Sequence, residues 1–190
     1  MSSAFQRELK KLSRHLVLIH RPAGMSSLFG FVVGSTDALV LLHSFDSEVF
    51  CLNGYDVIRQ CDIHSYCFFD DPRYWRHQAI RRLKIRPALP IGISLSSIQQ
   101  LLSSVAARYP LLSVHRETPL RTTTFVGPVM SMAEHTFTIE DSDYFGRWTG
   151  PRRLRYADVT LVCFEGGFLQ ASAMTARKIR GHKPQKFLEA

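Results

Sequence analysis

The chain has 190 residues, of which 45% are hydrophobic and 21% are charged. These proportions are typical of globular domains and exclude extended disorder, a collagen-like repeat or a coiled coil as the main architecture. No stretch approaches the ~20 uninterrupted apolar residues that span a bilayer. The 24 Lys and Arg residues outnumber the 16 Asp and Glu residues, and the resulting formal charge of +8 is compatible with a polyanionic partner.

The N-terminal residues and the cysteines indicate the compartment. Residues 1–11 contain no apolar core and no small-residue cleavage site, so they do not resemble a secretory signal. The 4 cysteines are too few for a disulfide scaffold. We therefore expect a cytoplasmic protein.

The elements of the first half follow a simple order. A capping-box pattern, Ser3 followed by Gln6, predicts an N-terminal helix. Extended segments follow at 16–20, 31–33, 38–43, 49–52 and 57–66, and Asn53-Gly54 predicts a hairpin turn between the last two. A second helix begins near Asp71 and Pro72, and its buried stripe is expected to be Trp75, Ala79 and Leu83.

The second half repeats this order. Ser94 is expected to cap a helix that carries Ile98, Leu102 and Val105 on one face. Strands are expected at 111–115, 129–132, 136–140, 144–148 and 154–163, with a turn at 149–151 and a final helix at 167–180. Residues 57–68 align with residues 153–164, and these aligned positions are identical: Arg59 and Arg155, Asp62 and Asp158, Cys67 and Cys163, Phe68 and Phe164.

The repeat predicts the fold class and the domain boundaries. Five short strands are most readily stabilised as a small antiparallel barrel, which removes exposed edges. We therefore expect an α+β, mainly β fold made of two tandem copies of a helix–five-strand–helix barrel in a pseudo-twofold relation. The proline-rich segment 86–92 separates the copies, so the units are residues 1–88 and 89–180, followed by a basic tail at 181–190 that is expected to be disordered.

The element order carries a resemblance. A helix followed by five short strands resembles the Sm-like and SH3-like small barrels. The stretch 30–66, with Gly-Phe-Val-Val-Gly-Ser, Phe-Asp, Leu-Asn-Gly-Tyr and Asp-Ile, is also similar to uncharacterised bacterial barrel proteins. The Sm-like resemblance implies RNA binding in a ring.

No catalytic or metal-binding pattern stands out. Cys61, His64 and Cys67 are evenly spaced, but in one strand the two cysteines would face opposite to the histidine, with their sulfurs about 20 Å apart. Core packing of the thiols is therefore expected, and no metal. The chain lacks a Gly-x-Ser-x-Gly elbow and the phosphate-loop and dinucleotide fingerprints, so we expect neither an enzyme nor a cofactor.

Two His-Arg pairs occupy matched positions at the ends of predicted strands. These are His20-Arg21 and His115-Arg116. Two interpretations are open. The pairs could form a duplicated anion contact, because arginine offers a bidentate fork. Alternatively they are polar strand ends, with each arginine bridging to Asp62 or Asp158 of its own repeat.

Basic residues gather in three clusters and carry the functional hypothesis. The candidate anion-binding residues are Arg73, Arg76, Arg81, Arg82, Lys84, Arg152, Arg153, Arg177, Lys178 and Arg180. Aromatic residues are interleaved with them, as in proteins that bind single-stranded nucleic acid. Stabilisation of helix ends and solubility are the simpler explanation. The leading hypothesis is a non-catalytic protein that binds nucleic acid or another acidic surface. The alternative is a protein-interaction module, such as a toxin-neutralising (immunity) or assembly protein, and a homo-oligomer is compatible with either.

Overall fold

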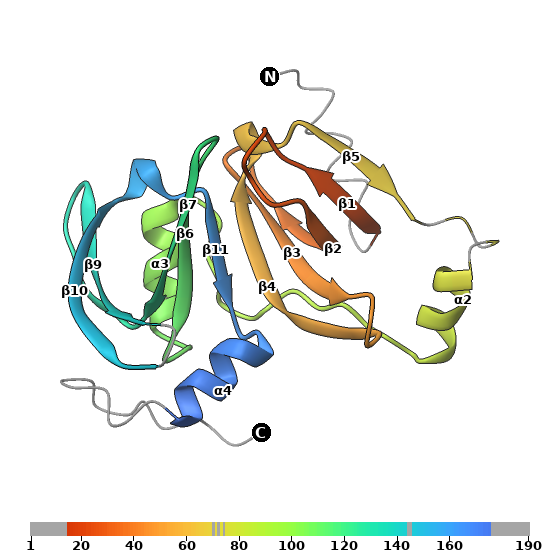
Figure 1. The fold of residues 1–190 in the computed structure, drawn as a ribbon. Coiled ribbons are helices and arrows are strands. Elements are labelled where there is room, and N and C mark those ends of the chain that lie inside the picture. The colour runs from red at the N-terminus through yellow and green to blue at the C-terminus, as the bar shows by residue number, and fades with distance from the viewer. Residues whose placement is uncertain (1–14, 70, 72, 74, 144–145, 176–190) are drawn as a thin grey trace.

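The computed structural model describes residues 15–69, 71, 73, 75–143 and 146–175, and this part of the chain is mainly β (Figure 1). An eight-stranded antiparallel open sheet has the order β5-β1-β2-β3-β4-β11-β6-β7, and a three-stranded sheet has the order β10-β9-β8. The first half supplies β1 (Leu16–His20), β2 (Leu28–Ser35), β3 (Leu39–Asp46), β4 (Cys51–Arg59) and β5 (Ser65–Phe68). The second half supplies β6 (Leu112–Thr118), β7 (Arg121–Gly127), β8 (Val129–Met132), β9 (Thr136–Ser142), β10 (Trp148–Arg155) and β11 (Leu161–Phe164).

The two halves share an order of strand pairing. β1 lies between β5 and β2, as β6 lies between β11 and β7. The register slips between Val32 and Gly34 where β2 pairs with β3, and between Val129 and Ser131 where β8 pairs with β9. The segments predicted as single strands at 57–66 and 154–163 are both interrupted by a 3₁₀ turn, η1 (Gln60–Asp62) and η2 (Tyr156–Asp158).

The prediction of two tandem closed barrels is wrong. β4, from the first half, pairs with β11, from the second half, and Ile58 lies opposite Leu161. The backbone groups along this edge of β4, which a closed first barrel would need, therefore hydrogen-bond to the second half instead. One open sheet runs through both halves, and neither sheet closes on itself. Pairing across the halves protects the edge of β4 in place of barrel closure.

The predicted turns at Asn53-Gly54 and 149–151 are also wrong, for the same reason in both halves. Gly54 and Gly150 lie inside β4 and β10, with φ values of +73° and +101° that favour glycine. A Cβ on Gly54 would lie 2.4 Å from the backbone nitrogen of Gly166. Both glycines allow irregular strand backbone, and Gly54 also allows the close approach of Gly166. The chain between β3 and β4 turns at residues 47–50 instead.

Three helices lie in the described residues: α2 (Trp75–Arg82), α3 (Ile98–Ala106) and α4 (Gly167–Thr175). The helix predicted after Ser94 is confirmed as α3, but its N-cap is Ser97, whose Oγ accepts the N–H of Gln100 at 3.1 Å. α3 buries Leu101, Leu102 and Val105 in a core shared with β3, β4, β6, β9 and β11. The predicted N-terminal helix and the tail 181–190 lie outside the described residues.

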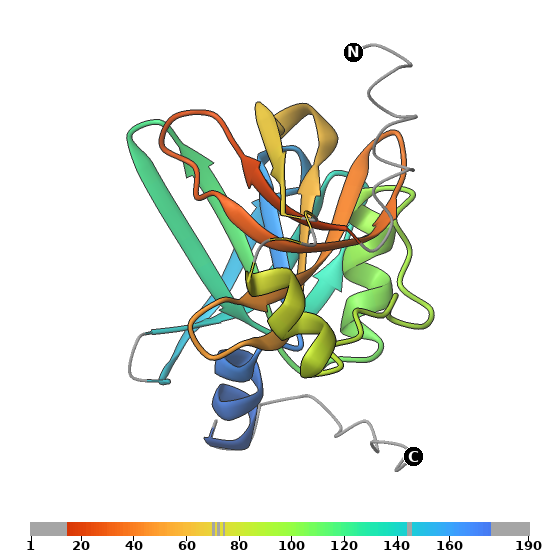
Figure 2. The same cartoon turned by 90° about the vertical axis from the view of Figure 1, so that its right-hand side faces the viewer.

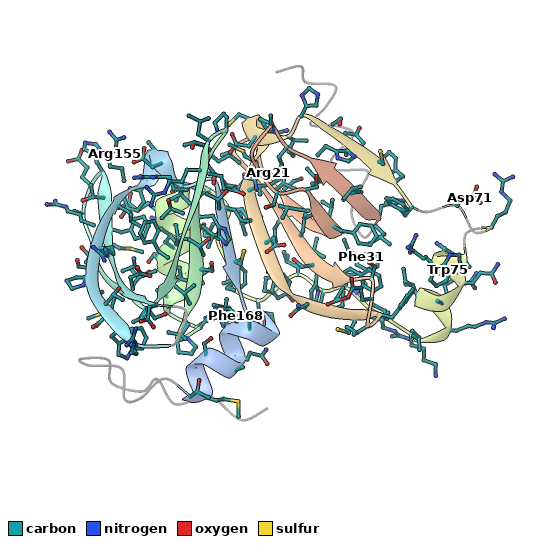
Figure 3. The ribbon with its side chains drawn as sticks, in the orientation of Figure 1. Arg21, Phe31, Asp71, Trp75, Arg155 and Phe168 are labelled. Atoms are coloured by element: carbon teal, nitrogen blue, oxygen red, sulfur yellow. The ribbon has the colours of Figure 1, made fainter. Side chains whose placement is uncertain are left out.

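A buried ionic network around Arg21, which Figure 3 labels, lies at the upper end of the seam between β4 and β11. Arg21 Nη2 lies 2.6 Å from Glu117 Oε2, and both side chains are 0% exposed. Arg21 also donates to the Thr160 carbonyl at 3.1 Å, while the Thr160 hydroxyl donates to Glu117 Oε2 at 2.8 Å. Since Arg21 and Glu117 come from different halves, the network holds them together.

Glu117 gives the seam a pH dependence. Burial alone would raise the pKa of Glu117, but hydrogen bonds from Arg21 and Thr160 lower it below its ordinary value. A carboxyl with a lowered pKa in the folded state stabilises the protein above its unfolded pKa of about 4.3, and this contribution disappears as the pH falls through the folded value. We expect the free energy of unfolding to fall below about pH 4.3.

Urea unfolding at a series of pH values would measure this component, with Glu117→Gln as the variant that cannot ionise. The variant should be less stable than the wild type at neutral pH, and its stability should fall less steeply on acidification. Equal acid slopes for the two proteins would show that Glu117 does not carry the effect.

Candidate polyanion-binding site

The two predicted basic clusters that lie in the described residues, one around α2 and one around β10, do not meet on one surface. The first cluster, residues 73–84, lies on and around α2, and the second, Arg152 and Arg153, lies on β10. These two elements are at opposite ends of the molecule, and Figure 2 shows the molecule from the α2 end. The labelled Trp75 and Arg155 mark these two ends (Figure 3). The third cluster, with Arg177, Lys178 and Arg180, lies outside the described residues. The two described ends can therefore be compared as separate candidate sites.

The burial predicted for α2 is wrong. Trp75 is 60% exposed and Leu83 is 58% exposed. Ile80 and Ile85 pack instead against an aromatic cluster that includes Phe31 and Phe45. Ile80 is five positions after Trp75, about 140° around the helix from it, so burying Ile80 turns Trp75 towards solvent.

The exposed Trp75 ring is held by two neighbours. Phe50, in the turn before β4, has its ring centroid 5.4 Å from that of Trp75, at an interplanar angle of 40°. The guanidinium carbon of Arg76 lies 5.0 Å from the Trp75 ring centroid, within the range of a cation–π contact. These two contacts restrict the indole, while Trp75 as a whole remains 60% exposed.

Among the described residues, the cations at and just after the C-terminal end of α2 have no acidic partner. Arg81, Arg82, Lys84 and Arg86 are all exposed. None of the acidic side chains in the described residues forms an ion pair with them. Arg73 differs, because its Nη2 lies 2.6 Å from Asp71 Oδ2 and its charge is matched. The positive charge of this end that no described acidic residue balances therefore lies in the last turn of α2 and in the residues just after it.

The β10 end carries four arginines, and aspartates of its own half lie beside three of them. Arg155 lies 2.8 Å from Asp158, and Arg147 lies 2.7 Å from Asp143. Arg152 approaches Asp141 at 3.9 Å. Arg153 donates to the Thr136 hydroxyl at 3.2 Å. This end has less uncompensated positive charge than the α2 end, so α2 is the stronger candidate for binding an anion.

The matched His-Arg pairs do not form a duplicated anion contact of equivalent residues. Arg21 is buried against Glu117, whereas Arg116 is exposed. The predicted bridges from these arginines to Asp62 and Asp158 are also wrong, because Arg59 and Arg155 occupy those carboxylates at 2.7 and 2.8 Å. Asp62 and Asp158 do form matching ion pairs in the two halves, but their partners are Arg59 and Arg155 rather than Arg21 and Arg116.

The two histidines instead lie beside the two aligned cysteines. His20 Nε2 is 3.9 Å from Cys67 Sγ, and His115 Nε2 is 3.7 Å from Cys163 Sγ. Cys67 is exposed, so the prediction that it packs in the core is wrong. Burial raises the pKa of Cys163 well above its ordinary value and lowers that of His115. Both shifts favour the neutral thiol and the neutral imidazole, which is the opposite of an activated cysteine nucleophile.

The described residues contain neither a cluster of metal ligands nor a long apolar helix. In this part of the chain no three His, Cys, Asp or Glu side chains gather as metal ligands. None of the described helices has the length and apolar character needed to cross a bilayer. Comparison of the chain with protein-family models, curated proteins and solved structures gave no match.

Proposed function

We propose that this is a non-catalytic cytoplasmic protein that binds nucleic acid or another polyanion through the α2 end. The observation that carries the proposal is the combination of the exposed Trp75 ring with four exposed cations that pair with no described acidic residue, Arg81, Arg82, Lys84 and Arg86. Unpaired arginines and lysines release condensed counterions from phosphates on binding, which supplies sequence-independent affinity.

The exposed indole favours nucleic acid among polyanions. A purely charged partner gains nothing from an aromatic surface, whereas nucleic-acid bases stack on aromatic rings. Trp75 and the unpaired cations lie on one short helix and its continuation, so one ligand can contact both. The net charge of +8 adds long-range attraction to the same class of partner.

The two ends of the molecule provide matched variants for the test. Arg81→Gln/Arg82→Gln neutralises an adjacent arginine pair on α2, and Arg152→Gln/Arg153→Gln neutralises an adjacent pair on β10. We expect the α2 variant to lose about tenfold in affinity for a labelled oligonucleotide at low salt, since two phosphate contacts are removed. Fluorescence anisotropy would measure both variants. Equal losses for the two would show that binding follows net charge rather than the α2 site.

A protein-interaction module, such as an immunity or assembly protein, is the second candidate. Large exposed apolar side chains outside α2 favour it: Phe168 on α4 is 69% exposed, and Leu120 between β6 and β7 is 98% exposed. Binding of one defined protein that persists after nuclease treatment and at high salt would support this candidate over the first.

A further inference from the structure

Given the proposed polyanion site, on which this step rests, we infer that its ligand is single-stranded nucleic acid, with one unpaired base stacked on Trp75. The cations at the other end of α2 contact the backbone phosphates of the same strand. The ligand is thus defined by two features together, a flat base that is free of its partner and a charged backbone.

The geometry of α2 brings these two contacts onto one face. Trp75 and Arg82 are seven residues apart, so they lie on the same side of the helix, two turns or about 10 Å apart along its axis. Both are exposed, while Arg76 and Ile80 between them are half-buried, and Ile80 packs against the aromatic cluster of the sheet. A strand that follows this face meets the indole first and the guanidinium group next.

The indole is prepared for stacking. Its contact with Phe50, at 5.4 Å between centroids, limits its freedom before any ligand binds, so less conformational entropy is lost on binding. Phe50 itself has a φ of +53°, which is rare for an aromatic residue, and the turn at 47–50 holds it there. Trp75 nevertheless keeps 60% of its surface exposed.

A duplex cannot use this arrangement fully. Its bases are stacked on each other, so a single exposed indole on a protruding helix meets only sugar and phosphate. A duplex or a sulfated polysaccharide would therefore bind through the cations alone, whereas a single strand gains the stacking contact as well. The inference is a preference among polyanions, decided by Trp75.

The test uses the full chain with Trp148→Phe, which leaves Trp75 as its one tryptophan. Oligo(dT) and oligo(U) of equal length, the corresponding duplex DNA and heparin are titrated while Trp75 emission is followed. Single strands should quench Trp75, and duplex and heparin should bind with little quenching.

Two substitutions make the result specific. Trp75→Ala should weaken single-strand binding by about 5- to 150-fold, because one stacked base is lost, and leave heparin binding unchanged. Trp75→Phe should restore most of the affinity, and its circular dichroism spectrum checks that α2 remains folded. If all polyanions bind equally and Trp75→Ala binds like the parent, the stacking inference is overturned while the proposed function stands. If no polyanion binds at low salt, both are overturned.

Discussion

Replacing Glu117 by Ala is expected to lower the free energy of unfolding by about 3–5 kcal/mol. The substitution leaves the Arg21 guanidinium buried without its counter-ion, and the Arg21 side chain is 0% exposed. It also removes the acceptor of the Thr160 hydroxyl and of the Ser26 N–H. Urea unfolding at neutral pH, followed by circular dichroism, measures the loss.

The double variant Arg21→Met/Glu117→Leu separates the cost of an unpaired charge from the value of the pair. Replacing both partners with apolar residues of similar size is often neutral or stabilising. We expect the double variant to be closer to the wild type than Glu117→Ala is. A loss below about 1 kcal/mol for Glu117→Ala would contradict the buried ionic network at the seam.

Replacing Phe164 by Ala is expected to cost about 3–5 kcal/mol as well. Phe164 is 0% exposed and stacks on Tyr55 of β4, with 5.1 Å between ring centroids. It also contacts Tyr109, which follows α3, at 5.1 Å. The substitution opens a cavity where the first half, β11 and the chain after α3 meet, and it removes both ring contacts of Phe164 at the seam.

Phe68 is the matched control, because it aligns with Phe164 in the repeat. It lies on β5 and is 48% exposed, so Phe68→Ala should cost less than about 1 kcal/mol. Thermal unfolding of both variants and the wild type measures the difference. Equal losses for Phe68→Ala and Phe164→Ala would contradict the distinct places of these residues at an outer strand and at the seam.

The strands were easier to predict than the way in which they pair. The apolar segments at 16–20 and 136–140 are strands, and the helix after Ser94 is α3, because these patterns depend on neighbours in sequence. Barrel closure depends on which edge strand meets which, and β4 pairs with β11, about 100 residues away in sequence. Asn53-Gly54 is the local sequence signal of a hairpin turn, yet Gly54 lies inside β4, where its positive φ allows an irregular strand backbone.

The candidate site, like the fold, could be predicted only in part from the sequence. The sequence indicates the basic clusters, but it does not show that aspartates accompany Arg147, Arg152 and Arg155. Nor does it show that Arg81 and Arg82 have no acidic partner in the part of the chain that the structure describes. The exposure of Trp75 was missed because the helix has two adjacent apolar stripes. One carries Trp75 and Leu83 and the other carries Ile80, and only packing against the aromatic cluster chooses between them.

The most direct measurement of the central claim is the salt dependence of oligonucleotide binding. If Arg81, Arg82, Lys84 and Arg86 each neutralise one phosphate, the logarithm of the association constant should fall against the logarithm of salt concentration with a slope of about −2.8 on single strands. Arg81→Gln/Arg82→Gln should reduce the steepness by about 1.4, and Arg152→Gln/Arg153→Gln should not change it. Absence of binding at low salt, or a slope that the α2 substitutions leave unchanged, would contradict the claim that α2 is a polyanion-binding site.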